Sequence, residues 1–567
     1  MSAKDDTDKE LQNCSVDYWE YYLKCNPAFA TYIGDHRYDD ALQDISEQSV
    51  SAQKKFYKNV LVRLEKIDRN SLCDENKLNI MLLKKSLSDR IQLYDFKTHF
   101  IPLDHLQGPH LEIPQIIEYH PFNTKKDFEN YVARLKAFPQ LIDQVIDNLQ
   151  TGIRHDIISY KKSIEYVIQQ SNTFAQFSPE DHPFYAPVKK SENGFSAKEK
   201  EEIQQMIKAT VISEITPAYK KLSCYLNDEY KNFCREKEGI WSLPNGSDMY
   251  AFLVKHHTTT DLSPEKIHKI GKGEIERISG EIRGIMKQMG FSGTTKKFAG
   301  YLRGKKELYH KQGQELLDDY RSILSKMDKK LPDYFGRLPK AKYGFKKIET
   351  YREKTAPAAY YYPPPKDFSR PGYFYVNTYK PEQRPVFEME ALAYHEAVPG
   401  HHLQIAIMQE LENIPDFRRY EGSTAFIEGW ALYAEKLAGE MGFYGDIYSQ
   451  YGRLTFEIWR AVRLVVDTGL HYYKWSRDDA VNFCKETTGL EDHEIEVEVD
   501  RYIVMPGQAL AYKIGEIKIL ELRKKAKNLL SSTFNIKSFH DKLLENGALP
   551  LFSLENVVDE WLKSLSV

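Results

Sequence analysis

The chain has 567 residues, of which 41% are hydrophobic and 28% are charged, so it can bury a sizeable core like an ordinary water-soluble protein. Its 79 basic and 82 acidic residues leave a formal net charge of −3, which excludes the strongly basic surface of a nucleic-acid-binding protein. The six cysteines are scattered and form no Cys-x-x-Cys pair, which disfavours both a disulfide scaffold and a cysteine metal site.

The first ten residues are charged or polar for the most part and lack the apolar stretch of a secretory signal peptide. No apolar run approaches the roughly 18 residues that a membrane helix needs. We therefore expect a cytoplasmic protein with neither a membrane nor a nucleic acid as partner. The sequence leaves its oligomeric state open.

Most of the chain up to residue 340 is predicted to be helical. Apolar residues recur at spacings of three and four among many lysines and glutamates in six segments, which are 49–69, 76–95, 126–150, 197–236, 264–289 and 306–327. Residues 104–110 and 183–196 are predicted to be loops, and the histidines of the first loop are expected at the surface. Residues 1–340 should form one lobe of the protein and a wall of its cleft.

The sequence pattern changes near residue 345. Residues 347–352 are a possible strand, and the Pro- and Tyr-rich segment 356–372 cannot be helical. Residues 373–379 are rich in aromatic and β-branched side chains and form the best predicted strand. From Val386 onward the helical period returns. The prediction is a mostly α, two-lobed fold with a small β-sheet beside the active-site helix.

The second predicted region, 341–567, contains the stretch most informative about function, residues 395–402. A strand, a connection and then a helix that carries a His-Glu pair is the order found in zinc peptidases, whose strand can pair with an extended peptide. Neutral imidazoles bind zinc, and an adjacent carboxylate such as Glu396 can activate a water on the metal.

The spacing of the histidines differs from the common one of four residues. On a straight helix His402 would lie about 10.5 Å along the axis from His395, and His401 would lie about 120° around it. Pro399 and Gly400 should break or bulge the helix, which could bring a second histidine back toward the metal. The alternative is a kinked helix whose histidines are solvated.

A third ligand is expected on the apolar helix that follows. Glu428 and Glu435 are seven residues apart and therefore share a face of this helix. Two acids on such a face are costly unless they are paired or bound to a metal. Glu428 is a candidate ligand and Glu435 a candidate partner of a ligand, and exposure of both at the surface is the alternative.

Four motifs resemble the domain-of-unknown-function 885 family: HEAVPGHHLQ at 395–404, EGWALYAE at 428–435, VVDTGLH at 465–471 and RYIVMPGQALAYK at 501–513. That family is similar to gluzincin-type zinc metallopeptidases, especially their oligopeptidase and thermostable-carboxypeptidase branches. These use His-Glu-x-Gly-His, then a Glu with a second Glu seven residues later, whereas this chain has two extra residues before its Gly-His.

The resemblance implies that Zn²⁺ is held by His395, His401 and Glu428, with Glu396 as the general base. The two extra residues leave His402 open as the alternative second histidine, since a longer bulge would favour it. We expect His401 to bind the metal and His402 to face the substrate or a neighbouring acid.

Two further segments are expected to line the same cleft. Arg453 to Trp475 is predicted to be an amphipathic helix in which Arg463, Asp467 and His471 form one polar stripe. A salt bridge explains the first two residues of the stripe, and His471 could reach the substrate or the site.

Residues 506–513 resemble the tyrosine segment with which oligopeptidases stabilise the tetrahedral intermediate. The resemblance makes Tyr512 a candidate oxyanion donor, with Gln508 beside it. Lys513 or Arg501 could hold a carboxylate of the substrate.

These features predict a zinc-dependent metallopeptidase that hydrolyses small peptides with a metal-activated water. One alternative is a zinc-dependent hydrolase or lyase that acts on a non-peptide small molecule in the same site. The other is a non-catalytic helical binding protein. The presence of both Glu396 and Glu428 argues against this alternative.

Overall fold

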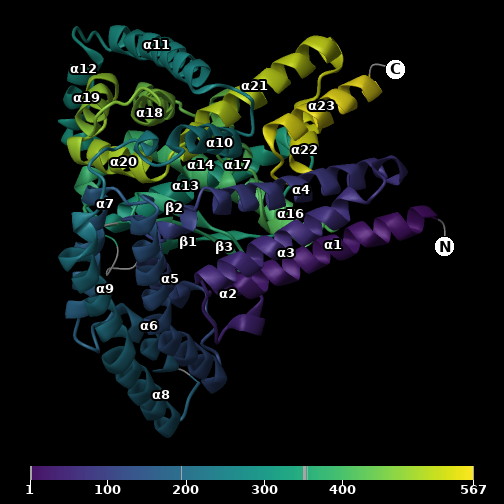
Figure 1. The fold of residues 1–567 in the computed structure, drawn as a ribbon. Coiled ribbons are helices and arrows are strands. Elements are labelled where there is room, and N and C mark those ends of the chain that lie inside the picture. Colours follow the sequence, from purple (N-terminus) through teal and green to yellow (C-terminus); the bar gives the residue numbers. More distant parts are fainter. Residues whose placement is uncertain (1–2, 193, 349–352, 354–355, 566–567) are drawn as a thin grey trace. The chain divides into compact units, whose positions relative to one another are not determined.

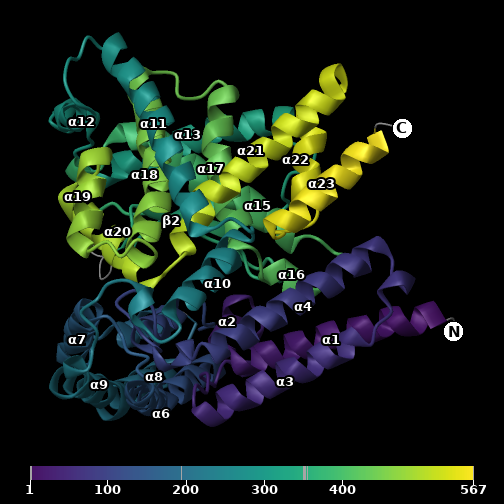
Figure 2. The ribbon, with the colours of Figure 1, turned by 45° about the horizontal axis from the view of Figure 1, so that its top comes forward.

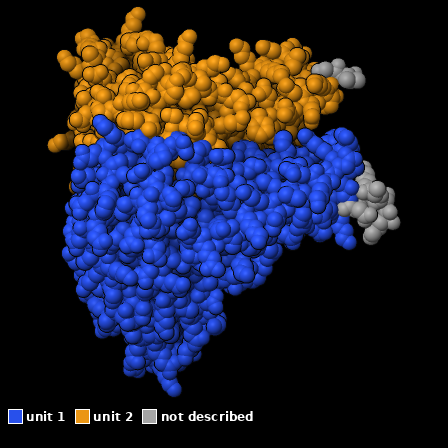
Figure 3. Space-filling model, viewed as in Figure 1, with its two compact units in different colours: residues 1–237, 242–245 blue, residues 238–241, 246–567 orange. Residues whose placement is uncertain are grey.

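The computed structural model describes residues 3–192, 194–348, 353 and 356–565, and these residues are mostly helical with a three-stranded sheet (Figure 1). They form two compact units, which Figure 3 colours separately. Unit 1 contains residues up to 237 together with 242–245, and unit 2 contains 238–241 together with 246 onward. No helix among the described residues is both long and apolar enough to cross a membrane.

Unit 1 is a helical array built around one large apolar core. Its helices are α1 (Ala3–Cys25), α2 (Pro27–Tyr32), α3 (Glu47–Glu65), α4 (Asp74–Asp95), α5 (Pro109–Gln115), α6 (Lys125–Arg154), α7 (Lys161–Gln176), α8 (Ala197–Thr210) and α9 (Thr216–Asp228). The helix expected over 197–236 is divided by a π-turn, Val211–Ile215, immediately before Pro217. Proline has no N–H to donate to the preceding turn, so the regular ladder cannot continue there.

Parts of two predicted surface loops in unit 1 are buried. Residues 104–108 are irregular, as predicted. Residues Pro183–Glu192 form a 3₁₀ helix that buries Phe184 and Val188, while Lys189 and Lys190 are exposed. His110 belongs to α5, is fully buried and hydrogen-bonds Gln170. The expectation of surface histidines was therefore wrong for His110, whose position is determined by the apolar residues around it.

Unit 2 contains the remaining helices and the sheet. Its helices are α10 (Gly246–Thr258), α11 (Pro264–Gln288), α12 (Thr295–Arg303), α13 (Gly313–Tyr334), α14 (Met389–Glu396), α15 (His401–Gln409), α16 (Asp416–Tyr420), α17 (Thr424–Glu440), α18 (Ile447–His471), α19 (Arg477–Thr487), α20 (Asp492–Val504), α21 (Ala511–Leu530), α22 (Ile536–Leu544) and α23 (Leu551–Leu565).

The sheet has the order β1-β3-β2, with β1 (Tyr343–Lys347) parallel and β2 (Ala359–Tyr362) antiparallel to the central β3 (Gly372–Val376). The strand predicted at 373–379 is confirmed as β3. The connection predicted at 356–372 is wrong in part, because it contains β2. The strand suggested at 347–352 falls largely on residues 349–352, which lie outside the described residues.

Helix α18 is the central element of unit 2 and is buried along nearly its whole length. The amphipathic pattern expected for it is present, but its polar residues Arg463, Asp467 and His471 are buried as well. Gly271 of α11 allows one close contact, since a Cβ there would lie 2.8 Å from the Cβ of Leu464 on α18. Figures 1 and 2 both show α11 lying along α18.

The contact between these helices also explains where the chain divides. Ile278 and Ile282 of α11 share one apolar cluster with Leu454 and Ile458 of α18. Helices α11 to α13 consequently belong to unit 2, and the two units separate between residues 237 and 246. The change in composition near residue 340, which suggested a division there, lies inside unit 2.

Helices α17 and α21 cross with their backbones in direct contact. A Cβ on Gly429 would lie 2.4 Å from the carbonyl carbon of Gly515, and a Cβ on Gly515 would lie 1.9 Å from the carbonyl oxygen of Ala425. Only glycine fits at these two positions. The crossing lies beside Glu428 and one helical turn from Tyr512, so it sets the separation between the helices that carry these side chains.

We expect G515A to destabilise unit 2, because its methyl group would collide with backbone atoms that cannot rotate away. Overpacking of this kind costs about 1–3 kcal/mol. G284A is the matched control, since Gly284 is exposed on α11 with nothing within 4 Å of its Cβ position, and alanine there should stabilise by about 0.5–1 kcal/mol. Thermal unfolding measures both. A melting temperature of G515A at or above that of the wild type would contradict the packing described.

Candidate active site and metal centre

The histidine motif lies where one helix ends and another begins. Helix α14 ends at Glu396 and α15 begins at His401, so the break expected at Pro399-Gly400 is present. A Cβ on Gly400 would lie 1.9 Å from the carbonyl oxygen of His395, and only glycine allows this return of the chain. The indole Nε1 of Trp430 donates to the carbonyl oxygen of Pro399 over 2.9 Å, which ties the reversal to α17.

The reversal brings His395 and His401 together with Glu428. The ring centroids of His395 and His401 are 4.8 Å apart, and the two ring planes are nearly perpendicular, at 83°. Oε2 of Glu428 lies 3.6 Å from Nε2 of each histidine. Tetrahedral zinc with bonds of about 2.0–2.1 Å requires its ligand atoms to be about 3.3 Å apart. The three atoms thus have nearly the spacing of three corners of a zinc site.

The protonation preferences of these groups match a cation site. Burial alone would raise the pKa of Glu428, but the nearby His395, His401 and Arg463 together outweigh burial and lower the pKa to about 2. Burial lowers the pKa of His401 to about 4, so its ring is neutral at pH 7. Oε2 of Glu428 is buried and has no hydrogen-bond partner among the described residues. Two imidazoles and a buried carboxylate oxygen that receives no hydrogen bond are a set of groups that fits a zinc ion.

Glu435 orients the first histidine. Its Oε1 accepts a hydrogen bond from Nδ1 of His395 over 2.7 Å, and the proton on Nδ1 leaves the lone pair of Nε2 directed toward Glu428 and His401. Burial opposes a charged ring in His395, yet Glu428 and Glu435 together raise its pKa to about 9. A metal ion at Nε2 would take the place of the proton that faces Glu428, while the N–H at Nδ1 remains bonded to Glu435.

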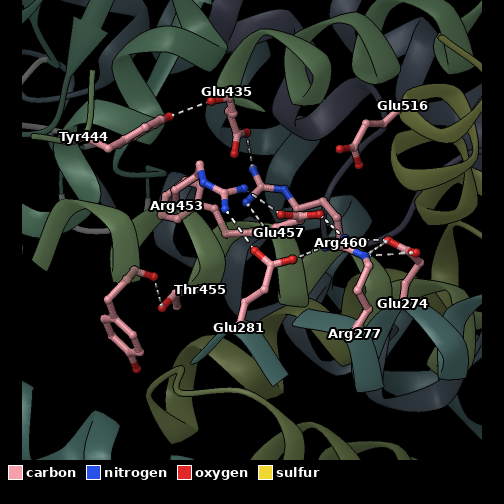
Figure 4. A network of polar contacts seen from close by, with 12 residues as sticks. Glu274, Arg277, Glu281, Glu435, Tyr444, Arg453, Thr455, Glu457, Arg460 and Glu516 are labelled. Atoms are coloured by element: carbon pink, nitrogen blue, oxygen red, sulfur yellow. Dashed lines mark hydrogen bonds and ion pairs between the residues drawn. The ribbon is translucent and has the colours of Figure 1, made fainter. Parts of the chain in front are cut away.

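Behind Glu435 lies a buried network of acids and arginines (Figure 4). Nη2 of Arg460 lies 3.9 Å from Oε1 of Glu435, and Arg453 donates to Glu457 over 2.7 Å. Such charges are tolerated inside a protein because each has an opposite charge nearby. The network helps to hold Glu435 in place, since Arg460 and Nδ1 of His395 both lie next to its Oε1.

Glu396 lies next to the three candidate ligands. A carboxylate oxygen of Glu396 and a ring nitrogen of each of His395 and His401 all lie within 4.8 Å of one another. The backbone N–H of Tyr361, in strand β2, donates to Oε2 of Glu396 over 3.0 Å. Burial raises the pKa of Glu396 to about 7, and the nearby Glu428 adds to this rise. The outer strand of the sheet therefore orients the candidate base.

Tyr512 and Arg501 form a second polar group in the site. Nη2 of Arg501 donates to the hydroxyl of Tyr512 over 3.2 Å and to Oε1 of Gln508 over 2.9 Å. Because the phenol oxygen accepts from Arg501, its own proton remains available to another acceptor. The guanidinium of Arg463 stacks on the ring of Tyr512, with 4.3 Å between its carbon and the ring centroid.

The structure places His402 away from the metal ligands. Its Nδ1 shares a 2.8 Å hydrogen bond with the hydroxyl of Tyr361, and its ring packs 4.8 Å from that of Tyr343. Burial lowers its pKa to about 4. His402 contacts the sheet, and the histidine that meets His395 and Glu428 is His401.

Two candidates for substrate contact are engaged elsewhere. Nδ1 of His471 accepts from the backbone N–H of Ile240, and its Nε2 is hydrogen-bonded to the carbonyl of Tyr502, so both ring nitrogens are occupied. Lys513 is 1% exposed and its ammonium group contacts Glu274, Glu457 and Glu516. A substrate carboxylate could not reach it.

The salt bridge expected between Arg463 and Asp467 is absent. Arg463 pairs with Glu498 over 3.1 Å. Asp467 accepts from the backbone N–H of Gly507 over 2.9 Å and from the hydroxyl of Tyr250 over 2.7 Å. Four-residue spacing on a helix permits a bridge, but partners from other helices lie closer here.

Three residues of the site were not anticipated: Arg460, Tyr361 and Trp430. Arg460 lies three residues before Arg463 on α18, and two arginines at that spacing in an otherwise apolar helix were a usable signal. Tyr361 and Trp430 contact residues 31 to 41 positions away in the chain, which no local pattern reveals.

The comparisons with known proteins agree with this fold. The model of the family described as "Bacterial protein of unknown function (DUF885)" matches residues 27–558. A crystal structure from Colwellia psychrerythraea, named a "putative lipoprotein", is 28% identical, with a TM-score of 0.93 and coverage of 98% of this chain and 99% of that one. A "putative lipoprotein of unknown function" from Shewanella oneidensis has 17% identity, a TM-score of 0.75 and coverage of 96% and 99%, and so shares the fold. No curated protein matches the chain.

Metal content should distinguish the two adjacent histidines. We expect about one zinc ion per chain in the wild type, close to none in H401A and an unchanged content in H402A, because only His401 meets the other ligand atoms. Elemental analysis after gel filtration in chelator-free buffer measures the content, and circular dichroism checks folding. Zinc retained in H401A but lost in H402A would reverse the assignment.

Proposed function

We propose that this chain, which belongs to the DUF885 family of bacterial proteins of unknown function, is a zinc-dependent peptidase acting on small peptides. One observation carries the proposal. Oε2 of Glu428 lies 3.6 Å from Nε2 of both His395 and His401, and the carboxylate of Glu396 lies beside them. A donor set without cysteine that adjoins a further carboxylate is typical of catalytic zinc sites.

Different residues would bind the metal and transfer the proton during hydrolysis. Zinc held by His395, His401 and Glu428 would supply a Lewis acid that polarises a carbonyl and makes water nucleophilic at neutral pH. Glu396 takes the proton of the attacking water and delivers it to the leaving amine, as a general base and then a general acid. The Tyr361 N–H keeps the carboxylate of Glu396 in the required orientation.

Tyr512 acts on the oxygen of the scissile carbonyl. Its hydroxyl accepts a hydrogen bond from Arg501, so its own proton can be donated to the oxyanion that forms during the attack. Arg463 stacks on its ring and Gln508 accepts from the same guanidinium group of Arg501. A donor that is held in place before reaction stabilises the developing charge without reorganisation.

The sheet favours a peptide as the substrate. Strand β2 is an outer strand of the sheet, and its residue Tyr361 contacts Glu396 directly. An extended peptide that lies along such a strand has its carbonyl groups presented at regular intervals to residues beside the sheet. A non-peptide substrate would make no use of this arrangement.

We further propose a cytoplasmic location for the protein. The two similar structures carry the name "putative lipoprotein", and a lipoprotein would be found with the membranes instead. Cell fractionation with an antibody against the full chain decides between the cytoplasm and a membrane-associated fraction.

Digestion of a synthetic peptide library, read by mass spectrometry, tests the peptidase proposal. The wild type should cleave a subset of the peptides, and a chelator should abolish cleavage. E396Q should retain zinc and lose about 10²–10⁴-fold in turnover, since glutamine cannot accept a proton. E382Q is the control, because Glu382 is an exposed residue of the same unit, and its turnover should be unchanged.

Three outcomes would contradict the proposal. E396Q with most of its activity would exclude Glu396 as the base. A wild type that holds zinc and cleaves no peptide, but hydrolyses non-peptide amides or esters, would show a different substrate class. A chain without any bound metal would leave the non-catalytic binding protein as the explanation.

Y512F should lower kcat about 10²–10³-fold and leave KM within a few-fold, because the lost proton donor acts on the transition state. Y472F is the matched control, since Tyr472 is 41% exposed, and it should behave as the wild type. Steady-state kinetics with one cleaved library peptide gives both constants. An increase in KM alone would show that Tyr512 only contacts the bound substrate.

A further inference from the structure

Three arginines gather around Tyr512. Arg463 stacks on the ring of Tyr512, and Arg501 donates to its hydroxyl. Arg460 lies one helical turn before Arg463 on α18, and its positive charge acts on Glu428 and on Tyr512. The three guanidinium groups therefore lie next to the candidate metal centre, around the group that faces the reacting carbonyl.

Few carboxylates contact these arginines. Glu498 is the partner of both Arg463 and Arg501, at 3.1 Å and 3.5 Å, and Glu435 is the partner of Arg460 at 3.9 Å. Two acids in contact thus serve three arginines. Glu388 is a third, more distant carboxylate that acts on Arg460.

A bound zinc ion would not change these contacts, since its two positive charges would face the carboxylates of Glu396 and Glu428. Arg463 and Arg501 share the single carboxylate of Glu498. A buried cation without a close partner of its own is costly, so such a site favours an anion.

The hydrogen bonds of the arginines show the same deficit. Nη1 of Arg463 and Nε of Arg460 are buried without an acceptor among the described residues. Nη2 of Arg501 is used by Tyr512 and Gln508, whereas its Nε makes no hydrogen bond to the described residues. The side chain of Arg501 is 22% exposed, so of the three it is the one that a ligand can reach.

We infer that Arg501, supported by Arg463, forms a subsite that binds a carboxylate of the substrate next to the bond to be cleaved. An arginine fork donates two parallel hydrogen bonds to a carboxylate, a geometry that lysine cannot match. Lys513, with three acidic partners, takes no part. The identification of the ligand as part of a peptide rests on the proposed function.

The carboxylate can come from two places in a peptide, its C-terminus or the side chain of an aspartate or glutamate. The first source would make the protein an exopeptidase that cuts near the carboxyl end. The second would give it a preference for acidic residues within a chain. Both place a negative charge within reach of Arg501, and neutral analogues separate them.

Binding to E396Q, measured by titration calorimetry, tests the inference without turnover. The first pair of probes is N-acetyl-alanyl-alanine and its C-terminal amide. The second pair is N-acetyl-alanyl-glutamate amide and N-acetyl-alanyl-glutamine amide. We expect the charged member of one pair to bind about tenfold to a hundredfold more tightly, since a charge-assisted hydrogen bond contributes this much.

Variants of the arginine, made in the E396Q background, assign the effect. R501Q should lose the preference for the charged probe, and R501K should keep part of it because the charge remains. R283Q is the control, since Arg283 is an exposed residue of α11 whose ion-pair partner among the described residues is Glu276, and it should keep the full preference. Thermal unfolding checks that each variant is folded.

Equal binding of charged and neutral probes in both pairs would overturn the inference, whatever the wild type cleaves, and this comparison needs no arginine variant. A preference that persists in folded R501Q would also overturn it. If the wild type cleaves no peptide, yet R501Q abolishes a preference for the charged probe, then the peptidase proposal fails while the anion subsite stands.

Discussion

The candidate metal centre depends on a contact between two backbone segments, Gly400 and the carbonyl group of His395. Six residues along a straight helix would carry the second imidazole to the wrong side. The chain instead leaves helix α14 after Glu396 and folds back so closely that a Cβ at residue 400 would lie 1.9 Å from that carbonyl oxygen. The new helix α15 then begins with His401, whose ring meets His395 and Glu428.

A second constraint comes from the charges buried around α18. This helix carries Arg453, Glu457, Arg460 and Arg463 inside unit 2, where each charge must face an opposite one. Their partners come from other helices, such as Glu435 on α17 and Glu498 on α20. Pairing across helices fixes how these helices pack, because a shift of one element would leave a charge alone. The same pairing holds Glu435 against Nδ1 of His395.

The sequence predicted the parts of this structure that local patterns encode. Helices α3, α4, α6 and α11 follow apolar spacing, β3 follows aromatic and β-branched residues, and the break at Pro399-Gly400 follows from the chemistry of those two residues. The family resemblance pointed to His395, Glu396, His401 and Glu428, which the structure brings together.

Features that depend on distant partners were missed. Lys513 and His471 were expected near the substrate, whereas the structure pairs them with other groups. Glu516 is three residues from Lys513, but Glu274, Glu457 and both partners of His471 lie on distant segments that no local pattern reveals. Strand β2 was hidden in a Pro- and Tyr-rich segment, since its pairing with β3 outweighs the local composition. The limit of unit 2 follows from α11 packing on α18, which a change in composition near residue 340 does not record.

The glycine crossing of α17 and α21 has a consequence for how such a protein could diversify. Because two backbones touch at Gly429 and Gly515, no residue larger than glycine fits between the helices that carry Glu428 and Tyr512. Most substitutions elsewhere in the chain would therefore leave the distance between Glu428 and Tyr512 unchanged. Arg501 lies on α20, outside that crossing. Selection could alter the groups that receive the ligand while the reactive geometry stays constant, so relatives with the same centre need not share a substrate.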